Sequence, residues 1–377
     1  MIQRVLPSTL EATVRPKRLA ERIHIDPPLL LGLIGIALLG IAVLYSAGSA
    51  DTDLLKRQGI RLGFGAVIMI VFAQIPPDRY HQWSPWVYIA GILMLIAVLI
   101  AGDIGKGAQR WLDFGVVRFQ PSEFAKLAIP MMVAWFMAKN AIPPRWWQLA
   151  IGGALIVMPV LLIAKQPDLG TALLVSAAGF FVLFLAGLSW RILIGGIVAL
   201  IPATWLLWEF GMKDYQRQRV LTFLNPDTDP LGSGYHIIQS TIAVGSGGLY
   251  GKGWTNGTQS QLDFLPERST DFIFAVFGEE FGLIGGLTLL ALYGFIVGRG
   301  LLIASNAQDS FSRLVAGSLS LTLLIYVFVN IGMVIGLLPV VGVPLPLISY
   351  GGTSMVTLMA GFGILMSIHT HRRLLTK

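Results

Sequence analysis

The sequence predicts an all-α, multi-pass membrane protein with about ten transmembrane helices, and three observations lead to that prediction. Of its 377 residues, 55% are hydrophobic and 12% are charged, about half the charged share of an ordinary soluble domain. The mean hydropathy is +0.72. The apolar residues also gather in runs of roughly 20, the length that an α-helix needs to cross a bilayer.

These runs follow one another along the chain, and we expect each to form one span. They cover about residues 28–46, 59–75, 83–101, 122–138, 147–164, 169–187, 190–209, 272–298, 312–336 and 351–368. The first run is longer than the roughly 7–15 apolar residues of a cleaved signal peptide, so we expect it to be retained. The chain then divides into an N-terminal tail (1–27), a membrane domain (28–369) and a C-terminal tail (370–377).

The distribution of charge predicts the orientation in the membrane. If the N-terminus is cytoplasmic and the spans alternate, the cytoplasmic segments carry 14 of the 27 basic and 5 of the 20 acidic residues, a net charge of +9, against −2 elsewhere. By the positive-inside rule, both termini are predicted to be cytoplasmic. This bias also accounts for the isoelectric point near 9.7, so no nucleic-acid partner is expected. The chain has no cysteine, which excludes disulfides and thiolate nucleophiles.

Two connections on the predicted outer side are long enough to be functional: residues 102–121, and residues 210–271 between the seventh and eighth spans. In the second, GYHIIQSTIAVG places apolar residues on one helical face and predicts a short helix on the outer leaflet. The six glycines between 245 and 257 predict turns. They match no nucleotide-binding motif, so a reaction here must use a substrate that is already activated.

Four carboxylates crowd the start of the eighth span, in FLPERSTDFIFAVFGEE at 264–280. They are Glu267, Asp271, Glu279 and Glu280. Asp271 can be the N-cap of the span or a functional carboxylate, and the acidic surroundings favour function. Glu279 and Glu280 are expected about 12 Å inside the membrane, where charge is costly, with at least one facing the bundle interior. Each can be part of a structural ion pair or have a direct role.

Basic residues on the same side can bind phosphate. Glu123 and Lys126 are three residues apart and can form a pair at the outward end of the fourth span. The lysine can snorkel to the interface, but its place one turn inside the helix favours a phosphate ligand. Arg110, Arg217 and Arg219 can bind phosphate bidentately or contact lipid head groups.

Three further features complete the predicted outer face. Trp111 is either an aromatic-belt residue or part of a site. Asp168 is predicted to cap the sixth span. The stretch VVGVPLPLISYGGTS (340–354) is apolar but contains two prolines, so we expect it to be non-helical and packed against protein. Together these features suit a substrate with an anionic head and a lipid tail.

Several motifs resemble the SEDS family (shape, elongation, division and sporulation proteins). They are KGAQRWLDFGVVRFQPSEFAK, QPDLGT, DYQRQRV, GYHIIQS, GSGGLYGKGW, FLPERSTDFIFAVFGEE and LPVVGVPLPLISYGG. The resemblance extends over nearly all of the chain, and the Arg in FLPER is similar to the elongation branch rather than the division branch. One departure is Ser269, which stands where that branch commonly has His and cannot titrate near neutral pH.

The resemblance implies a peptidoglycan glycosyltransferase. Such a protein polymerises lipid II into β-1,4 glycan strands outside the bacterial cytoplasmic (inner) membrane, for cell elongation and rod shape. It implies Asp271 as the essential carboxylate, and we group Glu267 with it as catalytic. The predicted substrate-binding residues are Lys126, Glu123, Trp111, Arg110, Arg217 and Arg219.

The chemistry of such a reaction fits these residues. A carboxylate in an apolar, acidic setting can take the proton of the attacking sugar hydroxyl. The leaving pyrophosphate needs cations, from Lys126, the arginines or a divalent ion such as Mg²⁺ or Mn²⁺. No other cofactor is expected. An α-linked donor and a β-linked product indicate one inverting displacement.

The alternative function is a lipid II flippase. A transporter is expected to show inverted repeats and midplane charges, and the sequence shows no clear repeat. A class B penicillin-binding protein is implied as partner, together with other elongation-machinery proteins, because we find no transpeptidase motif such as Ser-x-x-Lys in a folded outer domain.

Overall fold

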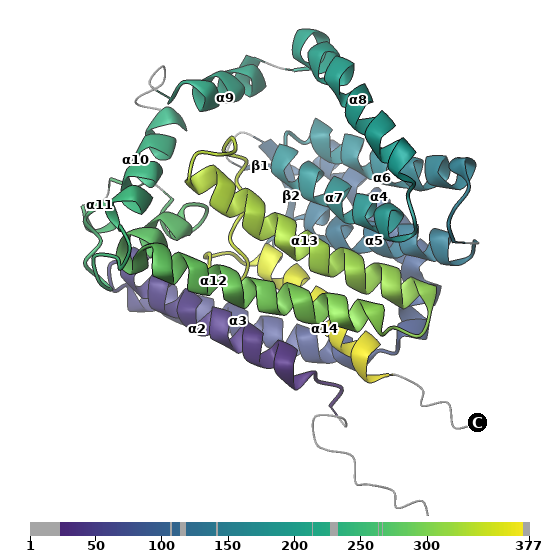
Figure 1. Cartoon of the computed structure of the whole chain (residues 1–377), viewed down its shortest axis with the longest axis horizontal. Helices are drawn as coiled ribbons and strands as arrows, with labels where there is room; N and C mark the ends of the chain where they lie inside the picture. The colour runs from purple at the N-terminus through teal and green to yellow at the C-terminus, as the bar shows by residue number, and fades with distance from the viewer. Residues whose placement is uncertain are drawn as a thin grey trace, which may run out of the picture.

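The computed structural model describes residues 23–105, 108–113, 118–140, 142–212, 214–226, 233–262, 264–265 and 267–371, and a helix lies over each predicted run (Figure 1). The helices are α2 (Pro27–Ala47), α3 (Thr52–Gln74), α4 (Pro77–Ala101), α5 (Pro121–Ala138), α6 (Trp146–Lys165), α7 (Leu169–Leu185), α8 (Trp190–Leu206), α12 (Ile273–Ser305), α13 (Ser310–Val334) and α14 (Thr353–Thr370).

In the described part of the chain, six helices are long and apolar enough to cross a membrane: α2, α4, α6, α12, α13 and α14. The protein is therefore a multi-pass membrane protein. The other four helices are shorter or carry more charge. α7 and α8 have 17 residues each, and the first turns of α3 and α5 contain acidic side chains.

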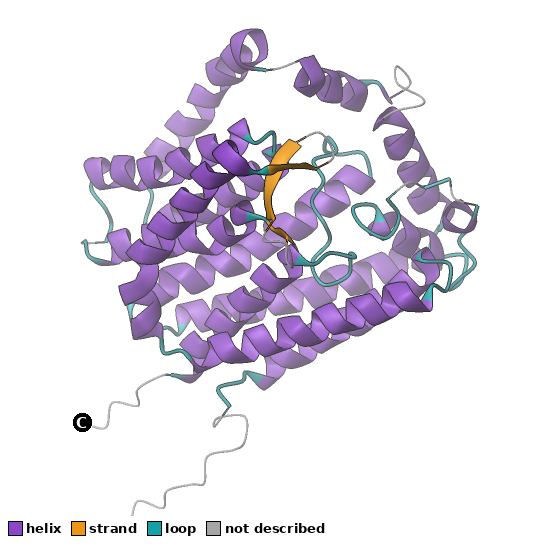
Figure 2. Ribbon diagram, turned by 180° about the vertical axis from the view of Figure 1, so that it is seen from behind, coloured by secondary structure: helices purple, strands orange, loops and turns teal. Residues whose placement is uncertain are grey.

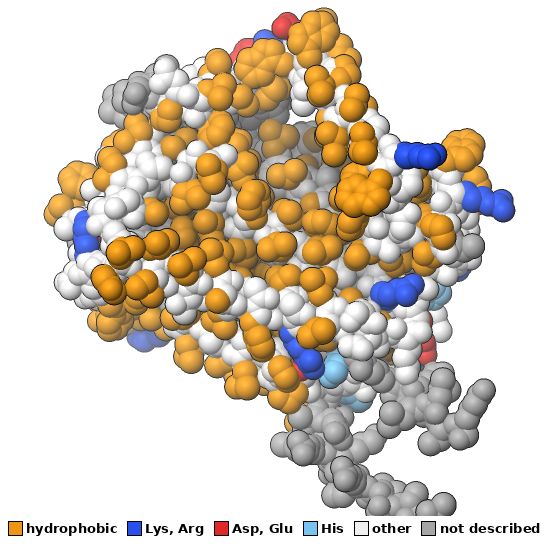
Figure 3. All heavy atoms as spheres, viewed as in Figure 1, with side chains coloured by type: hydrophobic (Ala, Val, Ile, Leu, Met, Phe, Trp, Pro, Cys, Tyr) orange, Lys and Arg blue, Asp and Glu red, His pale blue; other side chains and the backbone are white. Residues whose placement is uncertain are grey.

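α13 is the central helix of the bundle. It packs against α12, α7 and α5, while α14 packs against α3 and α2 against α12. Figure 3 shows that hydrophobic side chains cover most of one face of the molecule, with the charged ones near its edges. An apolar surface of this extent is suited to lipid rather than to water.

The connection at 102–121 corrects the all-α prediction. It contains a three-stranded antiparallel sheet of β1 (Asp103–Gly105), β2 (Ala108–Asp113) and β3 (Arg118–Phe119), which lies beside the loops in Figure 2. The strands are only two to six residues long and pair with their sequence neighbours. Such short local hairpins leave little periodic signal in a sequence.

The long connection between α8 and α12 contains further helical segments. They are η1 (Leu207–Gly211, a π-helix), α9 (Asp214–Leu224), α10 (Ser233–Ser246) and α11 (Thr258–Gln261). α8 and α9 arch away from the bundle, whereas α10 packs against α12 and α13 (Figure 1).

The predicted helix at GYHIIQSTIAVG is confirmed as α10. The predicted turns are confirmed at Gly248, Gly251 and Gly253, whose φ angles are positive. One side of α10, with Ile237 and Ser240, is buried, and the Ser240 hydroxyl donates to the carbonyl of Val334 at 2.9 Å. This face of α10 therefore lies against protein.

The eighth predicted span is not one continuous helix, because Gly282 inside α12 has non-helical backbone angles. The segment before it, from Ile273 to Glu280, is buried within the protein. The prediction that at least one of Glu279 and Glu280 faces the bundle interior is confirmed. Both side chains face the interior, with 0% of each residue exposed.

The two ends of the described chain lie together. The ring of His24 stacks on the ring of His371 with 3.9 Å between their centroids, so the start of α2 and the end of α14 are at the same end of the bundle. Most of the two predicted tails, residues 1–22 and 372–377, lies outside the described residues.

We predict that Gly40→Ala lowers the melting temperature in detergent. A Cβ at Gly40 would lie 2.7 Å from the carbonyl oxygen of Leu347 and 2.9 Å from Cα of Ile348, both in the loop between α13 and α14. The added methyl group therefore pushes α2 away from this loop and lowers the free energy of unfolding by about 1–3 kcal/mol. Gly63→Ala on α3 is the control, because its Cβ meets nothing within 4 Å and alanine favours a helix. Equal melting temperatures for the two variants would contradict the close contact.

Candidate functional site

Asp271 lies in the turn 267–272 that leads into α12. The N-cap position of α12 is Phe272, with no side-chain capping bond, so the capping interpretation of Asp271 is wrong. The residue is half-buried. A Cβ at Gly342 would lie 3.4 Å from Oδ2 of Asp271, so this glycine lets the loop at 340–352 approach the carboxylate.

That loop is bonded directly to the turn. The hydroxyl of Ser349 donates to the carbonyl of Thr270 at 2.6 Å, and the amide of Tyr350 donates to the carbonyl of Ser269 at 2.8 Å. The apolar side chains of the loop are largely buried. The prediction of a non-helical segment packed against protein is confirmed, and its role is to hold the turn that carries Asp271.

Asn330 on α13 holds the same turn from another side. It is 0% exposed, and its side-chain nitrogen donates to the carbonyl of Asp271 at 2.9 Å and to that of Val343 at 2.7 Å. The sequence analysis did not consider Asn330. An amide within the apolar run VFVNIG was the signal, because polar groups inside membrane helices are usually functional.

Lys126 and Glu123 form a buried ion pair near the start of α5. The two charged atoms are 2.7 Å apart, and the side chains are 5% and 7% exposed, so the snorkelling interpretation of Lys126 is wrong. The ammonium lies 5.0 Å from the ring centroid of Tyr326, one helical turn before Asn330. Glu123 keeps one buried carboxylate oxygen without a hydrogen-bond partner.

Arg110 and Trp111 project from β2. Nε of Arg110 donates to the carbonyl of Gln166 at 3.3 Å, and a second guanidinium nitrogen donates to the carbonyl of Pro167. Trp111 is half-buried. Arg110 thus ties the sheet to the connection between α6 and α7, and part of its donor capacity is already used by backbone oxygens.

The start of α7 joins the sheet region to the rest of the site. Asp168 accepts from the amide of Thr171 at 3.3 Å, which confirms its predicted capping role, and from the side chain of Gln120 at 2.8 Å. Gly170 lies against the carbonyl of Val341, where a Cβ would collide. The starts of α5 and α7 therefore meet beside the loop that contacts Asp271.

α9, which carries Arg217 and Arg219, does not lie beside Asp271 and Lys126. Arg217 donates to the carbonyl of Glu209 at 2.9 Å, and α9 stands apart from the bundle (Figure 1). Arg219 lies on the same helix, and its side chain is outside the described structure.

Glu267 and His236 lie beside the turn. Glu267 is exposed, has a φ of 52° and accepts from the Thr270 hydroxyl at 2.8 Å. His236 on α10 stacks on Phe272 with 5.6 Å between ring centroids. Burial lowers the pKa of His236, and the nearby Glu267 charge opposes this shift. The structure thus places an imidazole next to a turn in which Ser269 replaces the expected His.

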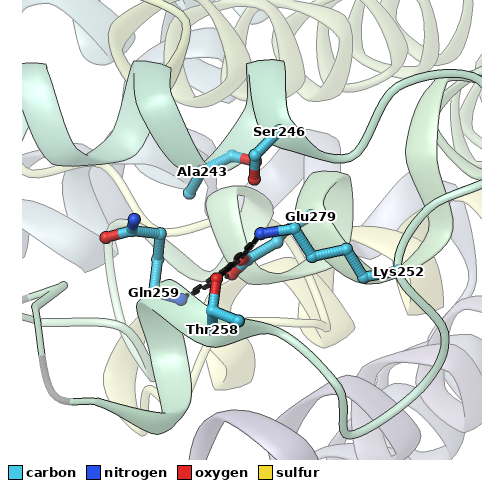
Figure 4. Close-up of polar contacts among 6 residues, drawn as sticks. All are labelled: Ala243, Ser246, Lys252, Thr258, Gln259 and Glu279. Carbon is cyan, nitrogen blue, oxygen red and sulfur yellow. Dashed lines mark hydrogen bonds and ion pairs between the residues drawn. The ribbon is translucent and has the colours of Figure 1, made fainter.

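Glu279 and Glu280 are occupied by structural contacts. Lys252 lies 2.7 Å from the Glu279 carboxylate, which supports the ion-pair interpretation (Figure 4). Glu280 accepts from the hydroxyl of Ser46 on α2. Neither carboxylate faces solvent, in contrast to Asp271.

Two arginines near the turn were not among the predicted site residues. The guanidinium of Arg61 on α3 lies 4.1 Å from the ring centroid of Tyr350, and Arg268 donates to the hydroxyl of Ser49 at 3.2 Å. A charged residue two positions inside the predicted second span was the available signal for Arg61.

The possible divalent cation remains a prediction. Within the described ranges, no group of three or more His, Asp or Glu side chains is placed to hold a metal ion. A cation at this site would thus need ligands from the substrate, as Mg²⁺ commonly takes from phosphate.

Comparisons with known proteins agree on one family. The family model of the FtsW, RodA and SpoVE cell cycle proteins matches residues 27–374. The peptidoglycan glycosyltransferase MrdB of Escherichia coli (strain K12) is 58% identical over 358 residues, which cover 95% of this chain and 96% of that protein. A probable FtsW of Geobacter metallireducens is 37% identical over 360 residues, covering 92% and 95%.

Solved structures share the fold. A chain from a peptidoglycan synthase complex, described for the structural coordination of polymerization and crosslinking, has a TM-score of 0.81 at 35% identity, covering 92% of this chain and 99% of that one. The rod shape determining protein RodA of Thermus thermophilus has a TM-score of 0.69 at 31% identity, covering 91% and 96%. This chain therefore belongs to the FtsW/RodA/SpoVE family, the SEDS family that its motifs resemble.

Proposed function

We propose that this chain is a peptidoglycan glycosyltransferase that polymerises lipid II into β-1,4 glycan strands for cell elongation and rod shape. The observation that carries the proposal is Asp271, a half-buried carboxylate held between the start of α12, the loop at 340–352 and Asn330. The 58% identity to MrdB over nearly the whole chain supports it.

The protein works from the cytoplasmic membrane with its site at the outer face. In this proposal α3, α5, α7 and α8 cross the membrane with the six longer helices, which makes ten spans in the domain 28–369 and an extracytoplasmic loop at 210–271. Both termini are cytoplasmic. The stacking of His24 on His371 supports their location on one side.

Asp271 acts as the general base. It takes the proton from the 4-hydroxyl of the acceptor sugar as that oxygen attacks the anomeric carbon of the donor. The new carbon–oxygen bond forms as the bond to pyrophosphate breaks, and the pyrophosphate leaves with the electron pair. A single displacement of this kind converts an α-linked donor into a β-linked product. Glu267, four residues earlier in the same turn, is proposed to act with Asp271 as a second catalytic carboxylate.

The pyrophosphate binds at the outward ends of α5 and β2. Lys126 gives one N–H to Glu123 and has further donor capacity for a phosphate oxygen. Arg110 and Trp111 flank the same region, and Mg²⁺ or Mn²⁺ can accompany the pyrophosphate. Arg217 and Arg219 reach it only if α9 moves toward the bundle.

A large apolar groove suits the polyprenyl tail. It has a volume of about 830 Å³ and lies between α4, α6 and the end of η1, with lining residues that include Ile96, Leu161, Leu169 and Met212. Lys165, the last residue of α6, also lines it. A cation beside an apolar channel fits a lipid whose head group is a pyrophosphate.

A class B penicillin-binding protein is the proposed partner, alongside other proteins of the elongation machinery. The described outer segments are a small sheet and short helices, so cross-linking needs a second protein. The solved complex with the same fold supports such pairing. Leu324, Phe328 and Leu337 on and after α13 are 46%, 58% and 65% exposed and offer an apolar surface for a membrane anchor.

Asp271→Asn is expected to lower lipid II polymerisation by at least about a hundredfold, because the amide keeps the shape but cannot accept the proton. Glycan ladders formed by the purified protein measure the rate. The matched control is Asp53→Asn, at an exposed ion pair on α3, which should polymerise normally. Near wild-type activity of Asp271→Asn would refute the assignment, and lipid II movement across vesicles without any glycan would favour the flippase.

Lys126→Met is expected to raise the lipid II concentration needed for half-maximal rate, because a phosphate ligand is lost. Since this variant also leaves Glu123 charged and unpaired, the double variant Lys126→Met/Glu123→Gln removes both charges. If Lys126 binds phosphate, the double variant stays impaired. Full recovery in the double variant would show that the pair is purely structural.

A further inference from the structure

α12 is interrupted near its outer end. Gly282 has φ 64° and ψ −162°, and it separates a short segment, 273–281, from the long remainder of the helix. The short segment is enclosed by protein, and Asp271 lies two residues before it. The direction of this segment therefore determines where the Asp271 carboxylate lies.

The loop at 248–253 completes the hydrogen bonds that the interruption breaks. In a continuous helix, the amides of Leu283 and Ile284 would donate to carbonyls four residues earlier. Here they donate to the carbonyls of Gly248 and Leu249, at 2.9 and 3.1 Å. The loop thus replaces the missing turn for the second part of α12.

The same loop also donates hydrogen bonds to the first part of α12, the short segment 273–281. The carbonyls of Glu279 and Glu280, which lose their helical donors, accept from the amides of Lys252 and Gly253, both at 3.0 Å. These two amides and two carbonyls of α12 are therefore all paired with the loop. A buried backbone group without a partner would cost about 1–3 kcal/mol.

This close approach of the loop backbone to α12 requires glycine, because a side chain would collide with α12. Gly251 has a φ of +79°, and a Cβ there would collide with the carbonyl of Glu280. A Cβ at Gly247 would collide with the carbonyl of Gly278. The loop backbone is therefore in direct contact with the end of the short segment.

The Glu279 side chain fastens the loop to the segment (Figure 4). Its carboxylate accepts from Nζ of Lys252 at 2.7 Å and from the hydroxyl of Thr258 at 3.0 Å. The amide of Gln259 donates to both of its oxygens, at 3.1 and 3.2 Å. The side chain of Glu279 is 0% exposed, so it does not touch a substrate.

We propose that Glu279 and Lys252 are positioning residues for Asp271, which rests on the proposed function. They hold the inner end of a short, straight segment whose outer end carries the base, about 12 Å away at 1.5 Å per residue. Releasing the inner end lets the segment tilt. A displacement of about 1 Å at a reacting group can lower the rate about a hundredfold.

The test compares Lys252→Met with Lys252→Arg in the full-length protein. Lys252→Met keeps the stem but removes the charge, and it should lower kcat at least about tenfold while leaving the half-saturating lipid II concentration unchanged. Lys252→Arg keeps the ion pair and should restore most of kcat. Lys56→Met, at the exposed pair with Asp53, is the control and should not change kcat.

A spectroscopic measurement separates positioning from simple stability. Because the chain has no cysteine, Ser269→Cys creates a unique position for a spin label in the turn that carries Asp271. The label should become more mobile in Lys252→Met and should stay as in the parent in Lys252→Arg. Melting temperatures are recorded for each protein.

Two results would overturn the proposal. One is a lower melting temperature with unchanged kcat and label mobility, which shows a structural role alone. The other is a changed half-saturating concentration with an immobile label, which shows a substrate contact. If the unaltered protein forms no glycan, the proposed function fails, and the label mobility still decides whether the Lys252–Glu279 pair controls the turn.

Discussion

The interruption of α12 at Gly282 is the constraint on which the arrangement around Asp271 depends. A helix that stops inside an apolar protein exposes amides and carbonyls that need partners. The loop at 248–253 supplies them, and glycine is required wherever its backbone meets α12. The long connection before α12 is therefore bonded directly to α12 at this point. Its contacts orient the short segment that ends at Asp271.

Three buried carboxylates are each paired with a basic side chain. Lys126 pairs with Glu123, Lys252 with Glu279 and Arg299 with Asp26, at distances of 2.7 to 2.9 Å. Each pair joins oppositely charged groups that would be costly to bury singly. Asp271 differs, because it is half-buried and lies in the turn before α12 rather than within a helix. Such a carboxylate is suited to exchange protons with a bound substrate.

The site is built from segments that are far apart in the chain. α13 carries both Tyr326, beside Lys126, and Asn330, which bonds to the Asp271 turn. The loop at 340–352 contacts that turn and also the start of α7 at Gly170. The Lys126 ammonium and the turn that carries Asp271 thereby contact α13 at positions about one helical turn apart. In the proposed reaction, this arrangement keeps the group that takes the proton apart from the group that stabilises the leaving pyrophosphate.

The sequence by itself determined the helices, the family and the group of polar residues at one face, because apolar runs, the acidic stretch 264–280 and the motifs are local signals. Only the tertiary structure decided which carboxylates are buried and which are partly exposed. It paired Glu279 with Lys252, buried Glu280 against Ser46 and excluded Asp271 as a cap. It also added the short sheet and left the α9 arginines apart. The physical reason is that these outcomes depend on contacts between segments distant in sequence, which neither periodicity nor spacing encodes.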